Sequence, residues 1–252
     1  MRFAIIGAGA IGAFLGAKLA VAGEDVSLIA RGPHLAAMHA NGVRVNSPDG
    51  DFEAHPVATD DPEAIGPVDY LFLTVKAHSL TQIAPTLGPM LGPATAVVSA
   101  QNGIPWWYFH RYGGPLDGTH LETLDPGGII NDAIAPERVI GCVVYPSTAI
   151  TEPGVVEHIE GNRFAIGEPD GSRSERCKLL SESLIKAGLR CPIRPRLRHD
   201  LWVKLLGNIA FNPVSALTKA SMVEIATDPD AGAIVRAMME ETYAVASALG
   251  ID

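Results

Sequence analysis

The stretch Arg2–Gly12, "RFAIIGAGAIG", decides the fold. It opens with a short apolar run, Arg2–Ile6, which is typical of a buried parallel strand. Three glycines follow at once, and the alanine-rich segment Ile11–Ala22 then predicts a helix. The sequence therefore predicts a strand, a glycine turn and a helix in direct succession.

The glycine spacing in this turn is G-x-G-x-x-G. Gly7 permits a tight turn, Gly9 leaves room for a diphosphate, and Gly12 lets the helix pack close to the strand. A diphosphate would then lie on the free N–H groups at the helix N-terminus. We therefore predict a dinucleotide site formed by Gly7, Ala8, Gly9, Ala10, Ile11 and Gly12.

Strands and helices continue to alternate through the first hundred residues. Further strands are expected at Asp25–Ala30, Asp69–Val75 and Thr95–Ala100, with helices at Pro33–Ala40 and Leu80–Leu87. This alternation predicts a parallel sheet with helices on both faces, which is a Rossmann-type doubly wound α/β fold.

The pattern changes in the second half of the chain. Residues Ile104–Pro136 are rich in glycine and proline and are expected to form a long excursion or lid. Later segments are expected to be strands at the antiparallel far edge of the same sheet, then a helix and a last strand: Arg138–Ile150, Gly154–Glu160, Arg163–Gly167, Ser172–Ala187 and Leu189–Ile193.

From Leu197 onward the pattern is helical only, so we predict two domains. Residues 1–196 would form the cofactor-binding domain, and residues 197–252 an all-helical C-terminal domain for substrate binding or dimerisation. A domain of so few helices buries little surface and is expected to have low stability on its own. We therefore expect this domain to form a homodimer or to continue further in the natural protein.

Arg31 follows the second strand, where an NAD-preferring site usually has an acidic residue. Its planar donors suit a 2′-phosphate, which favours NADP; the alternative is a solvated surface arginine. Lys76 and Asn102 end two further strands, and the carboxyl ends of such strands line the ligand crevice. Asn102 is followed by Gly103, however, and Asn-Gly is also a common turn pair.

Composition excludes several classes of protein. Of the 252 residues, 47% are hydrophobic, which is a globular composition. The net charge of −9 argues against a general nucleic-acid binder. No apolar stretch is long enough to span a membrane, and the three cysteines show no metal-binding spacing. We expect a cytoplasmic protein with buried free thiols and no metal.

A polar stripe interrupts the apolar segment Trp202–Pro213, "WVKLLGNIAFNP". Lys204, Asn208 and Asn212 are spaced by four and would lie on one helix face, with a kink or break at Pro213. The stripe could be a solvated helix edge. Alternatively, Lys204 stabilises and protonates the oxygen of a ketone under reduction, while Asn208 and Asn212 hold the substrate.

The motifs "GAGAIG", "TVKA", "QNG" and "LWVKLLGNIAFNPVSALT" resemble those of the ketopantoate reductase (2-dehydropantoate 2-reductase) family over nearly the whole chain. The resemblance implies NADP at Gly7–Gly12, with Arg31 and Lys76 at the adenosine phosphate. It implies Asn102 near nicotinamide and substrate, and a main-chain cofactor contact near Ala149. It also implies Lys204 as proton donor and Asn208 and Asn212 as substrate ligands.

Three departures leave the substrate open. Met222 stands near an expected polar substrate contact, further family substrate ligands would lie beyond residue 252, and the excursion after Asn102 is long and aromatic. Trp106, Trp107, Tyr108 and Phe109 could reshape the pocket or only anchor the loop. The alternatives are therefore a reductase of another bulky 2-oxo or 3-hydroxy acid, and a non-enzymatic NADP-sensing module.

Overall fold

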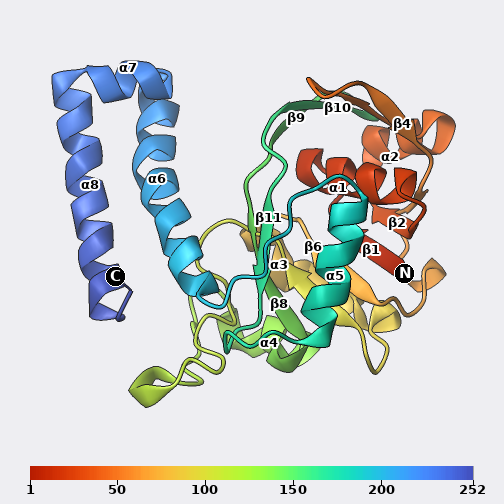
Figure 1. The fold of residues 1–252 in the computed structure, drawn as a ribbon, viewed down its shortest axis with the longest axis horizontal. Helices are drawn as coiled ribbons and strands as arrows, with labels where there is room; N and C mark the ends of the chain where they lie inside the picture. Colours follow the sequence, from red (N-terminus) through yellow and green to blue (C-terminus); the bar gives the residue numbers. More distant parts are fainter. Residues whose placement is uncertain (252) are drawn as a thin grey trace. The chain divides into compact units, whose positions relative to one another are not determined.

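The computed structural model describes residues 1–251 and divides into two compact units, residues 1–197 and the residues from Arg198 onward. Each unit has its own hydrophobic core. The first unit is an α/β structure, and the second contains helices α6, α7 and α8 (Figure 1). A Rossmann-type sheet followed by a helical C-terminal region is confirmed.

The main sheet has seven strands in the order β11-β8-β7-β6-β1-β2-β5. Its strands are β1 (Arg2–Ile6), β2 (Asp25–Ile29), β5 (Val57–Thr59), β6 (Tyr70–Leu73), β7 (Ala96–Ser99), β8 (Val139–Val144) and β11 (Phe164–Gly167). Neighbours pair in parallel except β11, which runs antiparallel to β8. The central strands are apolar along their whole length because helices cover both faces.

Helix α1 (Ala10–Val21) lies between the main sheet and a second, four-stranded sheet of order β4-β3-β10-β9. The second sheet consists of β3 (Val43–Asn46), β4 (Phe52–Ala54), β9 (Ser147–Glu152) and β10 (Val155–Glu160). The residues of α1 itself are mostly small or apolar on all sides of the helix, as expected for a helix that is buried on both sides. The remaining helices of this unit are α2 (Gly32–Asn41), α3 (Ala77–Ile83), α4 (Ile129–Ala133) and α5 (Glu175–Lys186).

The second sheet corrects one prediction. Segments β9 and β10 do not extend the main sheet; only β8 and β11 do. Strand β10 pairs in parallel with β3, and β3–β5 were not predicted because each has only three or four residues. The β9–β10 hairpin packs on the side of α1 that faces away from the main sheet. This side of α1 is also apolar, and Val156 and His158 of β10 are buried there.

Other boundaries also differ from the predictions. Helix α3 starts at Ala77 and ends before Pro85, where 3-10 turns follow. Residues Leu189–Ile193 pair with β11 only through two isolated bridges, because Pro192 has no N–H to donate. Helix α6 (Leu197–Thr218) continues through Pro213, so of the predicted kink or break, the break is wrong. Proline has no N–H group, so Pro213 removes one hydrogen bond from the interior of this helix.

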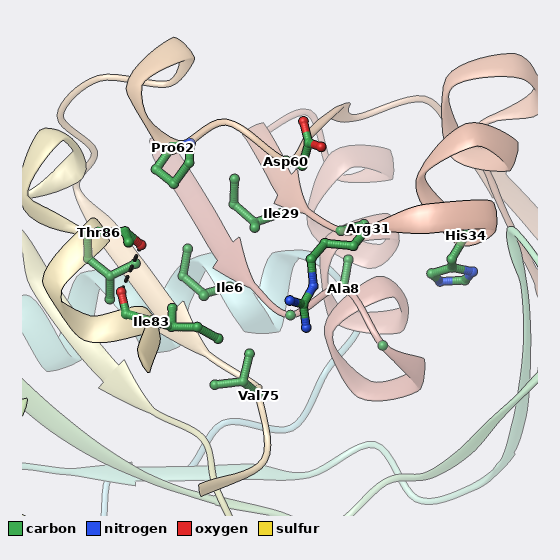
Figure 2. A pocket seen from close by; sticks show the side chains of 14 residues that line it. Ile6, Ala8, Ile29, Arg31, His34, Asp60, Pro62, Val75, Ile83 and Thr86 are labelled. Atoms are coloured by element: carbon green, nitrogen blue, oxygen red, sulfur yellow. Dashed lines mark hydrogen bonds between the residues drawn. The ribbon is translucent and has the colours of Figure 1, made fainter. Parts of the chain in front are cut away.

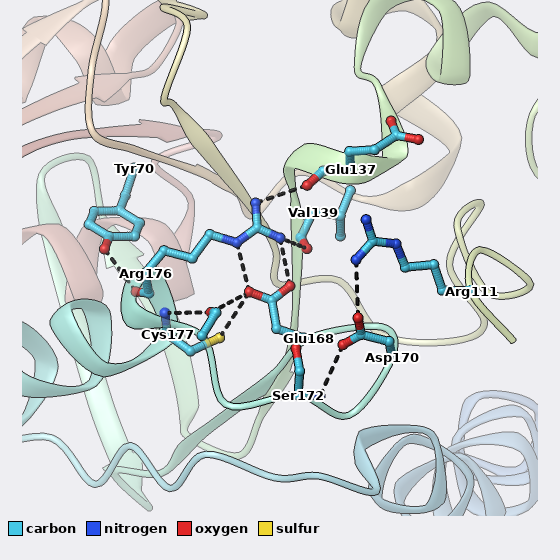
Figure 3. Close-up of polar contacts among 10 residues, drawn as sticks. Tyr70, Arg111, Glu137, Val139, Glu168, Asp170, Ser172, Arg176 and Cys177 are labelled. Atoms are coloured by element: carbon cyan, nitrogen blue, oxygen red, sulfur yellow. Dashed lines mark hydrogen bonds and ion pairs between the residues drawn. The ribbon is translucent and has the colours of Figure 1, made fainter.

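A partly buried ion pair ties α5 to the edge of the main sheet (Figure 3). The Arg176 guanidinium donates to Glu168 through Nε (2.7 Å) and Nη2 (2.6 Å), and it also donates to the carbonyls of Glu137 and Val139. Burial alone would raise the pKa of Glu168, but hydrogen bonds from Arg176 and Ser174 outweigh it and hold this pKa below its ordinary value. Glu168 is therefore ionised and fully paired.

The four aromatic residues of the excursion, for which a pocket role and an anchoring role were both considered, are all buried: Trp106, Trp107, Tyr108 and Phe109. A Cβ on Gly141 of β8 would clash with the Trp107 ring at 2.6 Å, so this ring packs directly on the sheet. The three cysteines are buried and free, as expected. Burial raises the pKa of Cys177 and of Cys191 to about 12, so neither thiol is reactive at neutral pH.

The second unit is a helical hairpin. Helices α6 and α8 (Pro229–Ala248) run side by side and are joined by α7 (Met222–Thr227) (Figure 1). Ser221 and Glu224 form a capping box at the start of α7, and Asp228 caps α8. Ala210, Val214, Ile225 and Val235 form the core between the three helices.

Candidate active site

The glycine turn between β1 and α1 is tightly constrained. Gly7 has φ +92°, and a Cβ there would lie 2.5 Å from Cγ1 of Val75. The Gly7 and Ala8 N–H groups both donate to the Ile29 carbonyl, and the Thr74 hydroxyl donates to the Gly7 carbonyl at 2.8 Å. These contacts hold the turn against the ends of β2 and β6.

Gly12 and Gly9 serve different purposes. A Cβ on Gly12 would lie 2.4 Å from the Gly7 carbonyl oxygen and 2.6 Å from Oγ1 of Thr74, so only glycine lets α1 approach the strand. A Cβ on Gly9 would have its nearest neighbour at 3.9 Å. Gly9 is also the N-cap of α1 and has no side chain to cover the first N–H groups. This end of α1 therefore has room and donors for an anion.

A cavity of about 490 Å³ opens beside this turn (Figure 2). Its lining residues come from the glycine turn, the ends of β2 and β5, and the segments around α3: Ile6, Gly7, Ala8, Gly9, Ile29, Ala30, Arg31, His34, Asp60, Pro62, Val75, Ile83, Thr86 and Leu87. The volume suits a small-molecule or cofactor site. Much of the cavity wall is apolar, which suits the flat aromatic base of a dinucleotide.

Arg31 is the N-cap residue of α2, and its side chain extends beside Ala8 of the glycine turn (Figure 2). The structure therefore brings four predicted cofactor residues, Gly7, Ala8, Gly9 and Arg31, around one cavity. Ala10, Ile11 and Gly12 form the first turn of α1 directly behind them.

The other predicted cofactor residues lie further from this cavity. Lys76 is exposed and precedes α3, next to Val75, which does line the cavity. Asn102 follows β7, the neighbour of β6, and Gln101 donates to the Val75 carbonyl at 2.8 Å. Ala149 lies on β9 of the second sheet, opposite Glu157, and does not line the cavity.

Lys204, Asn208 and Asn212 all lie on α6, within the second unit. Because this helix is continuous over the three positions, the side chains leave it on one face, as the spacing predicted. A lysine ammonium and two amides so arranged can donate hydrogen bonds to the oxygens of a small polar ligand.

Comparisons with known proteins agree with this picture. Residues 3–106 match the family model described as ketopantoate reductase PanE/ApbA, and residues 196–252 match the model of its C-terminal part. The chain is also 51% identical, over its full length and 77% of the relative, to 2-dehydropantoate 2-reductase of Mesorhizobium japonicum. The chain belongs to the ketopantoate reductase family.

Solved structures of this family have the same fold. The PanE/ApbA family ketopantoate reductase from Ralstonia eutropha JMP134 matches with a TM-score of 0.83 and 29% identity, covering 100% of this chain and 76% of that one. The 2-dehydropantoate 2-reductase from Geobacter metallireducens GS-15 matches with a TM-score of 0.82 and 29% identity, covering 97% and 74%.

Several residues that line the cavity were not predicted from the sequence. Asp60 and Pro62 follow β5, a strand too short to be predicted. Ile83 and Leu87 lie four positions apart, a spacing that could have indicated one helical face. His34 follows Arg31 by three positions and could have been found by the same argument.

His34 is the titratable group of the cavity with a perturbed pKa. Burial lowers the pKa of His34, and a contact with the Ala8 backbone partly opposes this. Its Nδ1 accepts a hydrogen bond from the Gly154 N–H at 2.9 Å, so the ring is neutral at pH 7. Within residues 1–251, His, Cys, Asp and Glu side chains form no group that could hold a metal ion, and no helix is long and apolar enough to cross a membrane.

Proposed function

We propose that this chain reduces a 2-oxo acid, ketopantoate, to the 2-hydroxy acid pantoate with NADPH. The observation that carries the proposal is the glycine-turn cavity with Arg31, in a chain 51% identical to a relative named 2-dehydropantoate 2-reductase. The reaction needs a dinucleotide site, a proton donor and ligands for a carboxylate or hydroxyl. The chain has candidates for each of these.

NADP fits the residues of the first unit. Open space at Gly9 and the uncapped start of α1 suit the diphosphate, and Arg31 suits a 2′-phosphate. Lys76 would add a second cation at this phosphate, while Asn102 would serve the nicotinamide end. The main chain near Ala149 would make one further contact with the cofactor. When bound, NADPH supplies the hydride, and the first unit is the cofactor-binding domain in this proposal.

The second unit would supply the groups that act on the substrate. Hydride addition to a ketone places negative charge on its oxygen, and the Lys204 ammonium would stabilise this charge and then donate the proton. The Asn208 and Asn212 amides would hold the substrate's hydroxyl or carboxylate so that its carbonyl carbon faces the cofactor.

The experiment is an assay of NADPH oxidation, followed by absorbance, with ketopantoate and a panel of other 2-oxo acids. The proposal predicts that ketopantoate has the highest kcat/KM by a wide margin. A higher value for a bulkier 2-oxo acid would retain the reaction and change the substrate. Tight NADPH binding without oxidation by any member of the panel would favour the sensing module instead.

A further inference from the structure

A side-chain hydrogen bond continues the contact between β6 and β7 beyond the ends of these strands. The two strands pair in parallel up to Leu73 and Ser99, and the Ala100 N–H donates to the Leu73 carbonyl at 3.1 Å. Two residues further along each chain segment, the side-chain amide of Gln101 donates to the Val75 carbonyl at 2.8 Å. Because a parallel ladder repeats every two residues, this bond lies where the next rung would lie.

Val75 carries the effect of this bond into the cofactor cavity. Its side chain lines the cavity (Figure 2), and a Cβ on Gly7 would lie 2.5 Å from its Cγ1. The carbonyl that Gln101 holds belongs to the peptide group between Val75 and Lys76, and Lys76 is the N-cap residue of α3. Because a peptide group is planar, the bond fixes the backbone of Lys76 together with the cavity wall at Val75.

The donor side of the bond lies next to another predicted ligand. Asn102, which would serve the nicotinamide end, directly follows Gln101 in the chain. Gly103 comes next with φ +92°, so the backbone turns immediately after Asn102. The partly buried Gln101 side chain anchors the backbone just before this turn. One hydrogen bond therefore joins the two strand ends that carry Lys76 and Asn102.

We propose that Gln101 is a positioning residue for the dinucleotide: by holding the Val75–Lys76 peptide group to the end of β7, it keeps the phosphate side and the nicotinamide side of the site in register. This inference rests on the proposed use of the cavity for NADPH. Gln101 acts through the protein main chain, whereas Arg31, Lys76 and Asn102 would contact the cofactor itself.

The test removes the donor in two ways. Gln101→Met keeps the length of the side chain without adding charge, and Gln101→Glu keeps its polar shape; neither has an N–H to donate at neutral pH. Dissociation constants of NADPH and of NADH are measured by fluorescence without any 2-oxo acid, and the KM for NADPH is measured with ketopantoate.

Tyr70→Phe is the matched control. The Tyr70 hydroxyl also donates to a main-chain carbonyl, that of Arg176, at 2.8 Å in a partly buried place (Figure 3). Tyr70 lies at the opposite end of β6 and does not line the cavity. The control therefore removes a bond of the same length and kind from the same strand, away from the cofactor site.

Both Gln101 variants should raise both dissociation constants by about three- to tenfold, the effect of one lost hydrogen bond, and should raise the KM for NADPH to match. Tyr70→Phe should lower the thermal stability by a similar amount and leave both constants unchanged. Wild-type affinity in either Gln101 variant overturns the inference, because packing or polarity without the donor would then suffice. An equal loss of affinity in Tyr70→Phe also overturns it, because the bond would then serve stability alone.

These outcomes are separate from those for the reaction. NADPH binding without reduction of ketopantoate, together with weaker binding by both Gln101 variants, would refute the proposed substrate and still support the role of Gln101. A wild type that binds neither nucleotide would overturn both proposals. Thermal unfolding of each variant, measured alongside, ensures that affinities are compared between folded proteins.

Discussion

At the scale of single residues, Gly9 and Gly12 allow opposite predictions for the same substitution. Gly9→Ala should keep stability within about 1 kcal/mol, because its φ of −73° suits alanine and its Cβ has space. Its methyl group would occupy the approach of the diphosphate, so NADPH affinity should fall about tenfold or more. Calorimetry and NADPH titration measure the two effects.

Gly12→Ala is the matched comparison. Its Cβ would meet the Gly7 carbonyl oxygen at 2.4 Å, so the protein should lose about 1–3 kcal/mol of stability as α1 is pushed from the strand. If Gly9→Ala destabilised the protein as much as Gly12→Ala, or left NADPH affinity unchanged, the open space at Gly9 would not be the diphosphate site.

Arg31 should determine the preference between the two nicotinamide cofactors. Arg31→Ala should weaken NADPH binding by about 10- to 100-fold, the effect of losing charge-assisted hydrogen bonds, and leave NADH binding nearly unchanged. The ratio of kcat/KM for the two cofactors measures this directly. An equal loss for both would show that Arg31 does not recognise the 2′-phosphate.

The position of Arg31 at the cavity was predictable, because it lies two residues after the end of β2 at Ile29, where a dinucleotide site places a residue that contacts the ribose. His34 and Asp60 were not predicted. The ring of His34 accepts a hydrogen bond from Gly154, which is 120 residues away in sequence, and such a contact has no local signal. Asp60 follows a three-residue strand that the main sheet stabilises through pairing with β2.

At the scale of elements, helix α6 carries the prediction for the reaction itself. Lys204→Ala should reduce kcat by about two to four orders of magnitude, the range for a lost acid catalyst, and leave NADPH affinity unchanged. Lys204→Arg keeps the positive charge but cannot release a proton at neutral pH, so it should also be slow. Near-normal turnover in either variant would remove Lys204 from the role of proton donor.

The contact between α5 and the sheet should be a major source of stability in the first unit. Glu168→Gln would leave Arg176, which is about one-third exposed, without its ionic partner, and should cost about 1–3 kcal/mol, less than for a fully buried pair because solvent screens the arginine. Glu175→Gln is the matched control, because its pair with Lys178 is exposed and should contribute less than about 1 kcal/mol. Denaturant unfolding of both variants measures the two losses of unfolding free energy. Similar losses in the two variants would contradict this prediction.

The same ion pair predicts a pH dependence. Because the folded protein holds the pKa of Glu168 below its ordinary value of 4.5, the stabilisation is present above pH 4.5 and is lost as pH falls through the folded pKa. Unfolding measured between pH 6 and pH 3, a range of about three units around the carboxylate pKa, should show a shallower loss in Glu168→Gln than in the wild type. Parallel curves of unfolding free energy against pH for the two proteins would show that the Glu168 carboxylate does not cause the pH dependence.

The secondary structure of long elements was largely predictable, and the second sheet was not. Helix α1 has mostly small or apolar residues on every side, and this composition already indicates burial on two faces. No local pattern says which strands supply the second face, because β3 and β10 are more than 100 residues apart in the chain and pair only through the fold. The excursion before β8 was predicted correctly, since no strand lies between β7 and β8, and its four aromatic residues are buried.

At the scale of the whole molecule, the sequence predicted a Rossmann-type unit followed by helices. The sequence pattern is purely helical from Leu197 onward, and in the structure the first unit also ends at Leu197. In the proposed function, the cofactor residues lie in the first unit, and Lys204, Asn208 and Asn212 lie in the second, while Asn102 of the first unit would lie near both the nicotinamide and the substrate. The chain covers 77% of the length of its Mesorhizobium relative.

The most direct measurement is the stoichiometry of the reaction catalysed by the wild type. Purified protein is incubated with NADPH and ketopantoate, and pantoate is quantified by chromatography beside the loss of NADPH absorbance. The account predicts one pantoate for each NADPH oxidised, with no pantoate in the Lys204→Ala control over the same time. NADPH loss without pantoate, or no loss at all with NADPH bound, would contradict it.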